Sequence, residues 1–373
     1  MKFITSSTKL FKAIQPLASI VGNNPALPII ENLLFEIQNN QLRITATDLE
    51  TTVINNTEVE SQSEDAIAVN AKLLLETLKS FPEQPLTFKK NEDNSTLEIT
   101  SEQGNYTIAY TNSNEFPHAP VLDNSKSASI SSKVLLRGIT NTLFATGNDE
   151  LRPVLAGIYI EVNNNKILFV GTDAHKLVKY ENQIISEESV NFIIPKKPLQ
   201  VVKNILNDFN ENIEINYNNT NLILSIGNIE VHCRLVDGSY PNYEAVIPKE
   251  NPNQLQIDRI TLLNSLKRIS IFSNQSTRQT KLQINGKEIK VSGEDIDFSN
   301  KAMEELTCEY EGQDIEIGFN GKFLIEILNT LESEKINMHF STPSKAAIIE
   351  PHNNMDDTEN ILMLVMPVML NQS

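Results

Sequence analysis

Hydrophobic and polar residues show two periodicities along this chain, and the first is that of an α-helix. Apolar residues recur at i, i+4 and i+7, as Leu10, Ile14 and Leu17 do, in segments that begin with Ser or Asp. That spacing predicts amphipathic helices, and those first residues are plausible N-caps. We therefore expect helices over residues 6–21, 131–147 and 258–272.

The second periodicity is strict alternation of apolar and polar residues, which predicts strands. The stretch "LPIIENLLFEIQNNQLRITATDLETTV" (27–53) has two alternating segments around an Asn-rich turn and then Thr-Asp. The same order returns 125 positions later in "RPVLAGIYIEVNNNKILFVGTDAHKLV" (152–178). A weaker third copy, "TRQTKLQINGKEIKVSGEDIDFS" (277–299), contains an Asn-Gly hairpin signal. The chain thus contains an internal repeat.

Further segments recur at nearly the same interval of 125 positions. A second amphipathic helix follows a strand at 69–81, 194–206 and 318–331, and "NEFPHAP" and "GSYPNYEAVIP" are closing segments 124 positions apart. The expected fold class is α+β, with three repeated domains that each pack two helices on antiparallel sheet. The expected domains are residues 1–122, 128–248 and 249–373.

Composition narrows the possible partners. The 373 residues carry a formal net charge of −17, so unspecific adhesion to nucleic acid or to an anionic membrane is not expected. There is no segment of transmembrane length and no signal-peptide pattern after Met1, which predicts a cytoplasmic protein without a membrane partner. Cys233 and Cys308 lie 75 positions apart and are expected to be buried small hydrophobes.

Basic residues are concentrated in four stretches that contain no acidic residue: 5–30, 131–148, 195–207 and 259–287. Three of these stretches hold the opening helix of a repeat. The distribution can be a chance property of solvated helix faces, a positive surface for phosphates, or a site for acidic proteins. Two or three cations per helix would bind phosphate weakly and without reading bases.

The chain ends on the apolar run "ILMLVMPVML" (361–370), followed by three polar residues. Ten residues are too few to span a bilayer as a helix, and Pro367 argues against an unbroken one. The run is either an ordinary core strand or a strand that also forms part of a binding surface.

An enzyme is not predicted. The five histidines show no HExxH, and the chain has no GxSxG and no phosphate-binding glycine loop. Asp48, Asp173 and Asp295 recur at matching positions, but we expect each to cap the turn after its strand. No cofactor and no metal site are predicted, and a non-catalytic repeat scaffold that binds acidic partners stays an alternative.

The motifs "LP…NLL…TDLE", "RPVL.G", "TDAHKL", "DGSYPNYEAVIP", "FSN" and the final "MPVML" occur in an order that resembles the bacterial sliding clamp family, the beta subunit of DNA polymerase III. The resemblance covers essentially the whole chain. It implies three clamp domains per chain and a head-to-tail homodimeric ring whose helices line a hole for duplex DNA. It also implies DNA-facing cations, which would be Lys9, Lys12, Lys133, Arg137, Arg152, Lys196, Lys197, Lys203, Lys267 and Arg268.

The resemblance further implies a hydrophobic groove that takes short linear motifs from the replicative polymerase, the clamp loader and repair proteins. Flexible Met side chains suit a groove that accepts different ligands. His175 can also be a satisfied surface or core histidine. Carried over by position, the groove residues are Leu155, Thr172, His175, Leu177, Pro241, Val246, Leu364, Val365, Met366, Pro367, Val368 and Leu370.

Ring closure by resemblance would use Tyr106 and Ile108 from the first domain and Ile271 and Phe272 from the third, although all four can be intradomain core. Three positions depart from the family. Asn24 stands where a DNA-touching basic residue is frequent, and Ala245 and Met369 stand where Arg or Lys is frequent near the groove.

Overall fold

The computed structural model describes residues 1–22, 25–61, 63–186, 189–353 and 356–370, so the predicted departure at position 24 lies outside the described residues. The chain divides into two compact units. The first contains Met1–Leu136 and Ile194–Leu235, and the second contains Arg137–Ile193 and the described residues from Val236 onward. Each unit is described by itself.

The first unit is built on a 13-stranded sheet in the order β10-β15-β16-β17-β4-β3-β2-β6-β9-β8-β7-β1-β5. All of its printed strand pairs are antiparallel. The strands are β1 (Lys2–Ser6), β2 (Asn32–Gln38), β3 (Gln41–Thr47), β4 (Thr51–Glu58), β5 (Glu60–Ser61), β6 (Asp65–Asn70), β7 (Pro85–Asn91), β8 (Thr96–Thr100), β9 (Asn105–Asn112), β10 (Lys126–Ser131), β15 (Asn212–Tyr217), β16 (Asn221–Ile226) and β17 (Ile229–Arg234).

The second unit has a nine-stranded sheet, β14-β11-β12-β13-β26-β25-β24-β18-β22, and a four-stranded sheet, β21-β20-β19-β23. The strands are β11 (Gly157–Asn163), β12 (Lys166–Thr172), β13 (Lys176–Gln183), β14 (Val190–Pro195), β18 (Asn253–Asp258), β19 (Gln279–Asn285), β20 (Glu288–Asp295), β21 (Asn300–Thr307), β22 (Glu309–Glu311), β23 (Ile315–Asn320), β24 (Lys335–Phe340), β25 (Ala347–Pro351) and β26 (Glu359–Val365).

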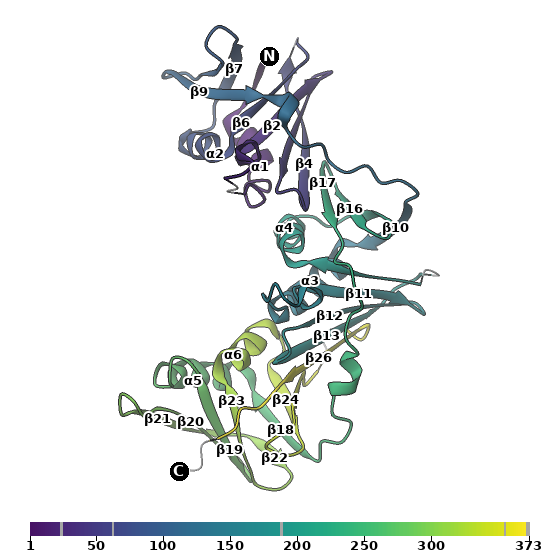
Figure 1. Cartoon of the computed structure of the whole chain (residues 1–373). Coiled ribbons are helices and arrows are strands. Elements are labelled where there is room, and N and C mark those ends of the chain that lie inside the picture. The colour runs from purple at the N-terminus through teal and green to yellow at the C-terminus, as the bar shows by residue number, and fades with distance from the viewer. Residues whose placement is uncertain (23–24, 62, 187–188, 354–355, 371–373) are drawn as a thin grey trace. The chain divides into compact units, whose positions relative to one another are not determined.

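Six α-helices occur in the described residues, two for each predicted repeat, which confirms the predicted α+β class. They are α1 (Ser7–Ile14), α2 (Ala71–Ser80), α3 (Ser132–Thr142), α4 (Lys196–Leu206), α5 (Arg259–Ile271) and α6 (Gly321–Thr330). Helices α1 and α2 pack together, as do α5 and α6 (Figure 1). The second helices begin at residues 71, 196 and 321, so they keep the step of 125 found in the sequence.

Helix α1 is shorter than the periodicity predicts, because Pro16 follows its C-cap at Gln15. A proline has no N–H to donate, and its ring clashes with the preceding turn of a helix. The helix starts agree with the predicted N-caps. The side chain of Ser6 accepts from the Lys9 N–H at 3.0 Å, and Asp258 Oδ1 accepts from the Thr261 N–H at 2.7 Å.

The repeat extends to backbone detail. Asn39 and Asn40 turn between β2 and β3 with φ of 51° and 62°, and Asn164 and Asn165 turn between β11 and β12 with φ of 51° and 60°. Two successive residues with positive φ are typical of the tight hairpin turn whose twist matches the strands, and asparagine tolerates that region. The Asn-rich turns seen in the sequence are therefore hairpin turns.

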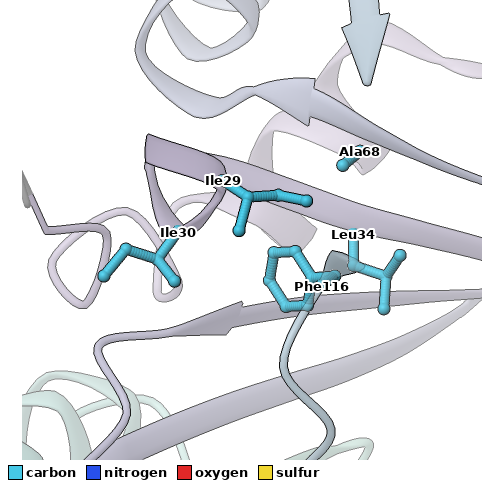
Figure 2. Close-up of a cluster of buried hydrophobic side chains, with 5 residues drawn as sticks. All are labelled: Ile29, Ile30, Leu34, Ala68 and Phe116. Carbon is cyan, nitrogen blue, oxygen red and sulfur yellow. The ribbon is translucent and has the colours of Figure 1, made fainter. Parts of the chain in front are cut away.

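The segment that closes the first repeat folds back onto its own repeat. Phe116 is 2% exposed and packs with Ile29 and Ile30 of the 3-10 helix η1 (Pro28–Glu31), Leu34 of β2 and Ala68 of β6 (Figure 2). Such an apolar cluster fixes where the chain leaves the first repeat.

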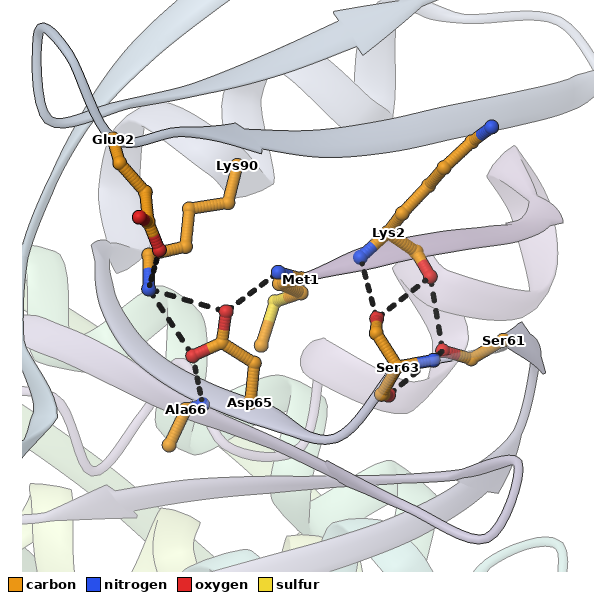
Figure 3. A network of polar contacts seen from close by, with 8 residues as sticks. All are labelled: Met1, Lys2, Ser61, Ser63, Asp65, Ala66, Lys90 and Glu92. Carbon is orange, nitrogen blue, oxygen red and sulfur yellow. Dashed lines mark hydrogen bonds and ion pairs between the residues drawn. The ribbon is translucent and has the colours of Figure 1, made fainter.

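A polar network fastens β1 beside β6 and β7. The ammonium group of Met1 lies 2.5 Å from Asp65 Oδ2, and Lys90 Nζ lies 3.2 and 3.1 Å from the two oxygens of the same carboxyl (Figure 3). Burial alone would raise the pKa of Asp65, but hydrogen bonds from the Met1 and Lys90 ammonium groups together lower it below its ordinary value of 3.8.

Cys233 is 1% exposed and Cys308 is 5% exposed, which confirms both as buried small hydrophobes. Burial raises the pKa of Cys233 to about 12 and that of Cys308 to about 11. Both thiols are therefore protonated at neutral pH.

Among the described residues, no helix combines the length and the apolar character that a membrane crossing requires.

Candidate functional site

The floor of the candidate groove is a strand pair in the second unit. Leu177 of β13 and Leu364 of β26 are direct register partners, and each is 2% exposed. They form one apolar cluster with Val170 of β12 and Ala346. Side chains of adjacent strands at paired positions lie on the same face of a sheet. The two predicted leucines therefore lie together.

A strap formed by residues 240–247 packs onto this cluster. Tyr240, Tyr243 and Ile247 are its packed residues, and the 3-10 helix η5 (Tyr243–Val246) lies within it. The Tyr240 ring stacks on Tyr159 of β11 at a centroid distance of 5.0 Å, and its hydroxyl donates to the Val170 carbonyl at 3.3 Å. Burial raises the pKa of Tyr240, so this hydroxyl remains a donor at neutral pH.

The strap also contains two predicted groove residues, Pro241 and Val246. Both are exposed, and Val246 is 54% exposed. The strap therefore packs onto the apolar cluster and leaves apolar atoms of Val246 uncovered.

The C-terminal segment is held by main-chain hydrogen bonds at two points. The Met366 N–H donates to the His175 carbonyl at 2.8 Å, and the Met366 side chain is 39% exposed. Further on, the Val368 N–H donates to the Gly318 carbonyl of β23 at 2.8 Å. Pro367 lies between these two anchors. The main chain thus crosses from the β13 turn to the four-stranded sheet.

Two further residues predicted for the groove are Val365 and Leu370. Val365 is 0% exposed and pairs with Lys176, so it faces the side of the sheet opposite to Leu364. Leu370 packs at Gly318, where a β-carbon on the glycine would come within 2.7 Å of Leu370 Cδ2. Leu370 therefore anchors the end of the segment on β23.

The remaining predicted positions surround the Thr-Asp turn. Thr172 is 8% exposed and donates through Oγ1 to the Lys176 carbonyl at 2.7 Å. Leu155, also 8% exposed, ends the 3-10 helix η4 (Pro153–Leu155), and its carbonyl accepts from the Gly147 N–H at 2.7 Å. His175 is exposed, and its ring stacks on Phe323 of α6 with centroids 6.1 Å apart.

Sequence reasoning missed Tyr159, Phe323 and Ala346. Tyr159 has a signal in the alternating pattern of β11. Residues two positions apart in a strand lie on one face, which places Tyr159 on the face of the polar Glu161 and not on that of the buried Ile158 and Ile160. Phe323 and Ala346 belong to another repeat, and only the tertiary structure brings them to this site. No local sequence signal marks them.

Three recurring aspartates cap turns, as the sequence predicts. Asp48 Oδ1 accepts from the Glu50 and Thr51 N–H groups, Asp173 Oδ1 from those of His175 and Lys176, and Asp295 Oδ1 from that of Asp297. Among the residues that the structure describes, no group of three or more His, Cys, Asp or Glu side chains is arranged to hold a metal ion.

Several of the predicted DNA-facing cations pair with carboxylates within the described residues. Arg137 donates to Glu359 at 3.1 and 2.8 Å and to Glu332 at 2.6 Å, and these hydrogen bonds raise its pKa despite partial burial. The other pairs are Lys197 with Asp48 at 2.5 Å, Arg152 with Asp149 at 2.8 Å and Arg268 with Glu304 at 2.6 Å.

The other predicted cations lie on the helices that the acid-free stretches form. Lys9 and Lys12 on α1, Lys133 on α3 and Lys267 on α5 are exposed. Lys196 and Lys203 on α4 are partly exposed.

The predicted interface residues differ in exposure. Ile271 is 70%, Phe272 41% and Tyr106 40% exposed, whereas Ile108 is 4% exposed. Strand β21 is at the edge of its sheet, and β9 pairs with β6 only at residues 110–112. Both strands therefore have backbone groups on an open edge within the described structure.

Comparison with known proteins gives a consistent result. Models described as the N-terminal, central and C-terminal domains of the DNA polymerase III beta subunit match residues 1–120, 129–242 and 244–367. A beta sliding clamp from Pseudomonas putida is 28% identical over 366 residues, which are 97% of this chain and 99% of that one. A beta sliding clamp from Vibrio cholerae is 26% identical over 372 residues, 99% of this chain and 100% of that one.

Solved structures agree. A sliding clamp from Pseudomonas aeruginosa bound to griselimycin has a TM-score of 0.91 at 27% identity and covers 99% of this chain and 100% of its own. A sliding clamp from Bartonella birtlesii bound to griselimycin has a TM-score of 0.92 at 26% identity, with the same coverage.

Proposed function

Because this chain belongs to the DNA polymerase III beta subunit family and is a sliding clamp, we propose that two copies join head to tail into a ring around duplex DNA. The ring holds DNA without sequence specificity. It tethers the replicative polymerase, the clamp loader and repair proteins, and it has no catalytic activity of its own. It acts in the cytoplasm, with domains at residues 1–122, 128–248 and 249–373.

The open edges of β9 and β21 support ring closure, since an unpaired edge is a template for strand pairing with a second chain. Ile271 and Phe272 add exposed apolar surface near the end of α5, and Tyr106 adds an aromatic side chain on β9. Ile108 supports the interface only indirectly, by packing β9 onto its own domain. Native mass spectrometry is expected to give the mass of two chains, and a stable single chain would contradict the ring.

Exposed lysines on α1, α3 and α5 support the proposal of a cationic lining. Contacts of this kind release counterions, so they weaken steeply with salt and read no bases. A clamp needs that weakness in order to slide, and closure of the ring supplies the retention. In the paired cations Arg137, Arg152, Lys197 and Arg268 the nearby carboxylate offsets part of the positive charge and so weakens its attraction for phosphate.

The alternative is a repeat scaffold that binds acidic partners without encircling DNA. It is favoured by one observation, the pairing of these four cations inside the chain, because that pairing reduces the charge available for phosphate.

The groove observation that carries tethering is the apolar floor of Leu177 and Leu364 beside the partly exposed Met366 and Val246. An apolar, largely pre-formed surface with a few main-chain polar groups suits a short extended peptide. We therefore propose that this groove takes the linear motifs of the partner proteins.

The test uses a fluorescein-labelled peptide that contains the short linear motif of the replicative polymerase. Combined Leu177→Ala and Met366→Ala changes are expected to weaken binding at least about tenfold, as truncation of central interface residues does. Ile185→Ala is the control, because that side chain is fully exposed at 103%. Unchanged anisotropy titrations in the double variant would refute the groove.

Griselimycin offers a second test, because two similar clamps have been solved bound to it. We propose that this chain also binds griselimycin, and at the same groove. Griselimycin is then expected to displace the labelled peptide, with an apparent affinity that falls in the double variant. Simultaneous binding of both ligands would contradict a shared site.

A further inference from the structure

A buried ammonium group lies beside the groove, and the proposed function does not use it. Lys176 is the first residue of β13, and its side chain is 6% exposed. Successive residues of a strand face opposite sides of the sheet, so Lys176 points away from the face of Leu177. Its Nζ lies 2.7 Å from Asp173 Oδ2, 3.3 Å from Glu326 Oε2 and 4.4 Å from the centroid of the Phe323 ring.

Asp173 links this ammonium group to the turn before β13. One carboxylate oxygen accepts the N–H groups of His175 and Lys176, each at 2.9 Å, while the other oxygen faces Nζ. Ala174, inside the turn, has a φ of 75°, a region that is costly for a residue with a β-carbon. Because of that cost, the turn needs the carboxylate to stay in place.

Helix α6 provides the other two contacts. Phe323 and Glu326 are three positions apart and therefore lie on one face of the helix. The Phe323 ring receives the ammonium group on its face, an attractive cation–π arrangement, and also stacks against the His175 ring at an interplanar angle of 22°. The main-chain carbonyl of His175 in turn accepts from the Met366 N–H at 2.8 Å. These contacts join the β13 turn, α6 and the C-terminal wall of the groove.

We infer that Lys176 is a positioning residue of the groove. Its charge holds two carboxylates from different parts of the second unit, and the seam between the β13 turn and α6 closes around it. A buried charge is tolerated only with such compensation. Lys322 Nζ also lies 3.8 Å from Glu326 Oε1, but its side chain is 61% exposed, so Lys176 is the buried cation that both carboxylates share. Without the ammonium group, Asp173 and Glu326 repel each other, the seam opens, and His175 and Met366 shift relative to Leu177.

The inference rests on the proposed function, since its readout is binding of the labelled peptide. Lys176→Met keeps most of the volume and removes the charge, and it is expected to weaken binding about tenfold through the displaced wall. Adding Glu326→Gln to Lys176→Met removes the repulsion and is expected to restore binding to within about threefold of the unchanged protein. A side chain that acted only by filling space would show no such rescue.

Lys166→Met is the matched control. Lys166 forms an ion pair with Glu181 at 2.7 Å, but its side chain is 52% exposed and it lies at the opposite end of the β12–β13 hairpin. The same chemical change is expected there to alter affinity by less than about twofold, as exposed ion pairs contribute little.

The outcomes separate cleanly. If Lys176→Met binds like the unchanged protein, or if the double variant binds no better than Lys176→Met, the inference is wrong. If the unchanged protein does not bind the peptide, the proposed function itself fails. Should Lys176→Met not fold by circular dichroism, Glu326→Gln alone decides the question: about threefold weaker binding supports the inference, and unchanged binding overturns it.

Discussion

Two strand pairs, β4–β17 in the first unit and β13–β26 in the second, share a backbone plan and differ in surface. The first strand of each pair, β4 or β13, follows a Thr-Asp turn in which the aspartate accepts two main-chain N–H groups. The residue after the aspartate, Leu49 or Ala174, has a positive φ. At equivalent register positions, however, the first pair places Thr52 opposite His232, and the second places Leu177 opposite Leu364.

The ammonium partner of the aspartate differs as well. Asp48 receives Lys197 from helix α4, whereas Asp173 receives Lys176 from the strand itself. The side chain of Lys197 is 45% exposed, and that of Lys176 is 6% exposed. The comparison shows that the two copies share a backbone plan, and that a few side chains at paired positions give one copy an apolar cluster.

The largest effect is expected at Arg137, which donates two hydrogen bonds to Glu359 of β26. Arg137→Met removes two hydrogen bonds from Glu359, whose side chain is 10% exposed, and should lower the free energy of unfolding by about 3 kcal/mol. Urea unfolding measures the change. Arg152→Met is the control, because the exposed pair of Arg152 with Asp149 is worth less than about 1 kcal/mol. Equal losses of unfolding free energy in both variants would contradict a special role for the Arg137–Glu359 pair.

Exchanging floor residues tests the comparison itself. Leu177→Thr gives the second pair the residue found in the first, and loss of apolar contact is expected to cost about 2 kcal/mol of binding, or about 30-fold in peptide affinity. The reciprocal Thr52→Leu change should leave peptide affinity as it was, since the first pair offers no apolar partner in His232. Peptide titration by anisotropy decides, and an unaffected Leu177→Thr variant would show that the floor is not used.

Acid is expected to weaken the ion pairs of Asp65 with Met1 and Lys90 in the first unit. The folded pKa of Asp65 lies below its ordinary 3.8, so its stabilisation is present above about pH 4 and is lost as the pH falls through the folded value. Asp65→Asn should therefore cost about 1–2 kcal/mol at pH 7, and the difference from the unchanged protein should shrink by pH 3. Urea unfolding at both pH values checks this, and a pH-independent difference would argue against the ion pairs with Met1 and Lys90.

The smallest effect is expected at Lys197. Its pair with Asp48 is partly solvated, so Lys197→Met should change the free energy of unfolding by less than about 1 kcal/mol. A loss above about 2 kcal/mol would mean that the two aspartate–ammonium pairs are energetically alike.

Much of the fold could be predicted because it depends on local patterns. Helical spacing located all six helices in the described residues, and the Asn-rich turns located the hairpins. The error at the end of α1 arose where the apolar pattern runs past Pro16, since hydrophobic spacing does not register a missing N–H.

The site was predictable only in part. The run "LMLVM" does not say which residues face outward, and the register with β13 places Leu364 on the groove face and Val365 on the other. Partners from distant segments are beyond any local pattern: Arg137 meets Glu332 and Glu359 across 195 and 222 positions. Lys176 meets Phe323 and Glu326 in the same way.

The most direct test of the clamp is retention on DNA of different topology. The protein is loaded by its clamp loader onto a nicked circular plasmid, the sample is divided, one half is linearised, and the bound fraction is measured by gel filtration. A ring that slides should stay on the circle and be lost from the linear DNA. Equal retention on both, or equal loss from both, would contradict it.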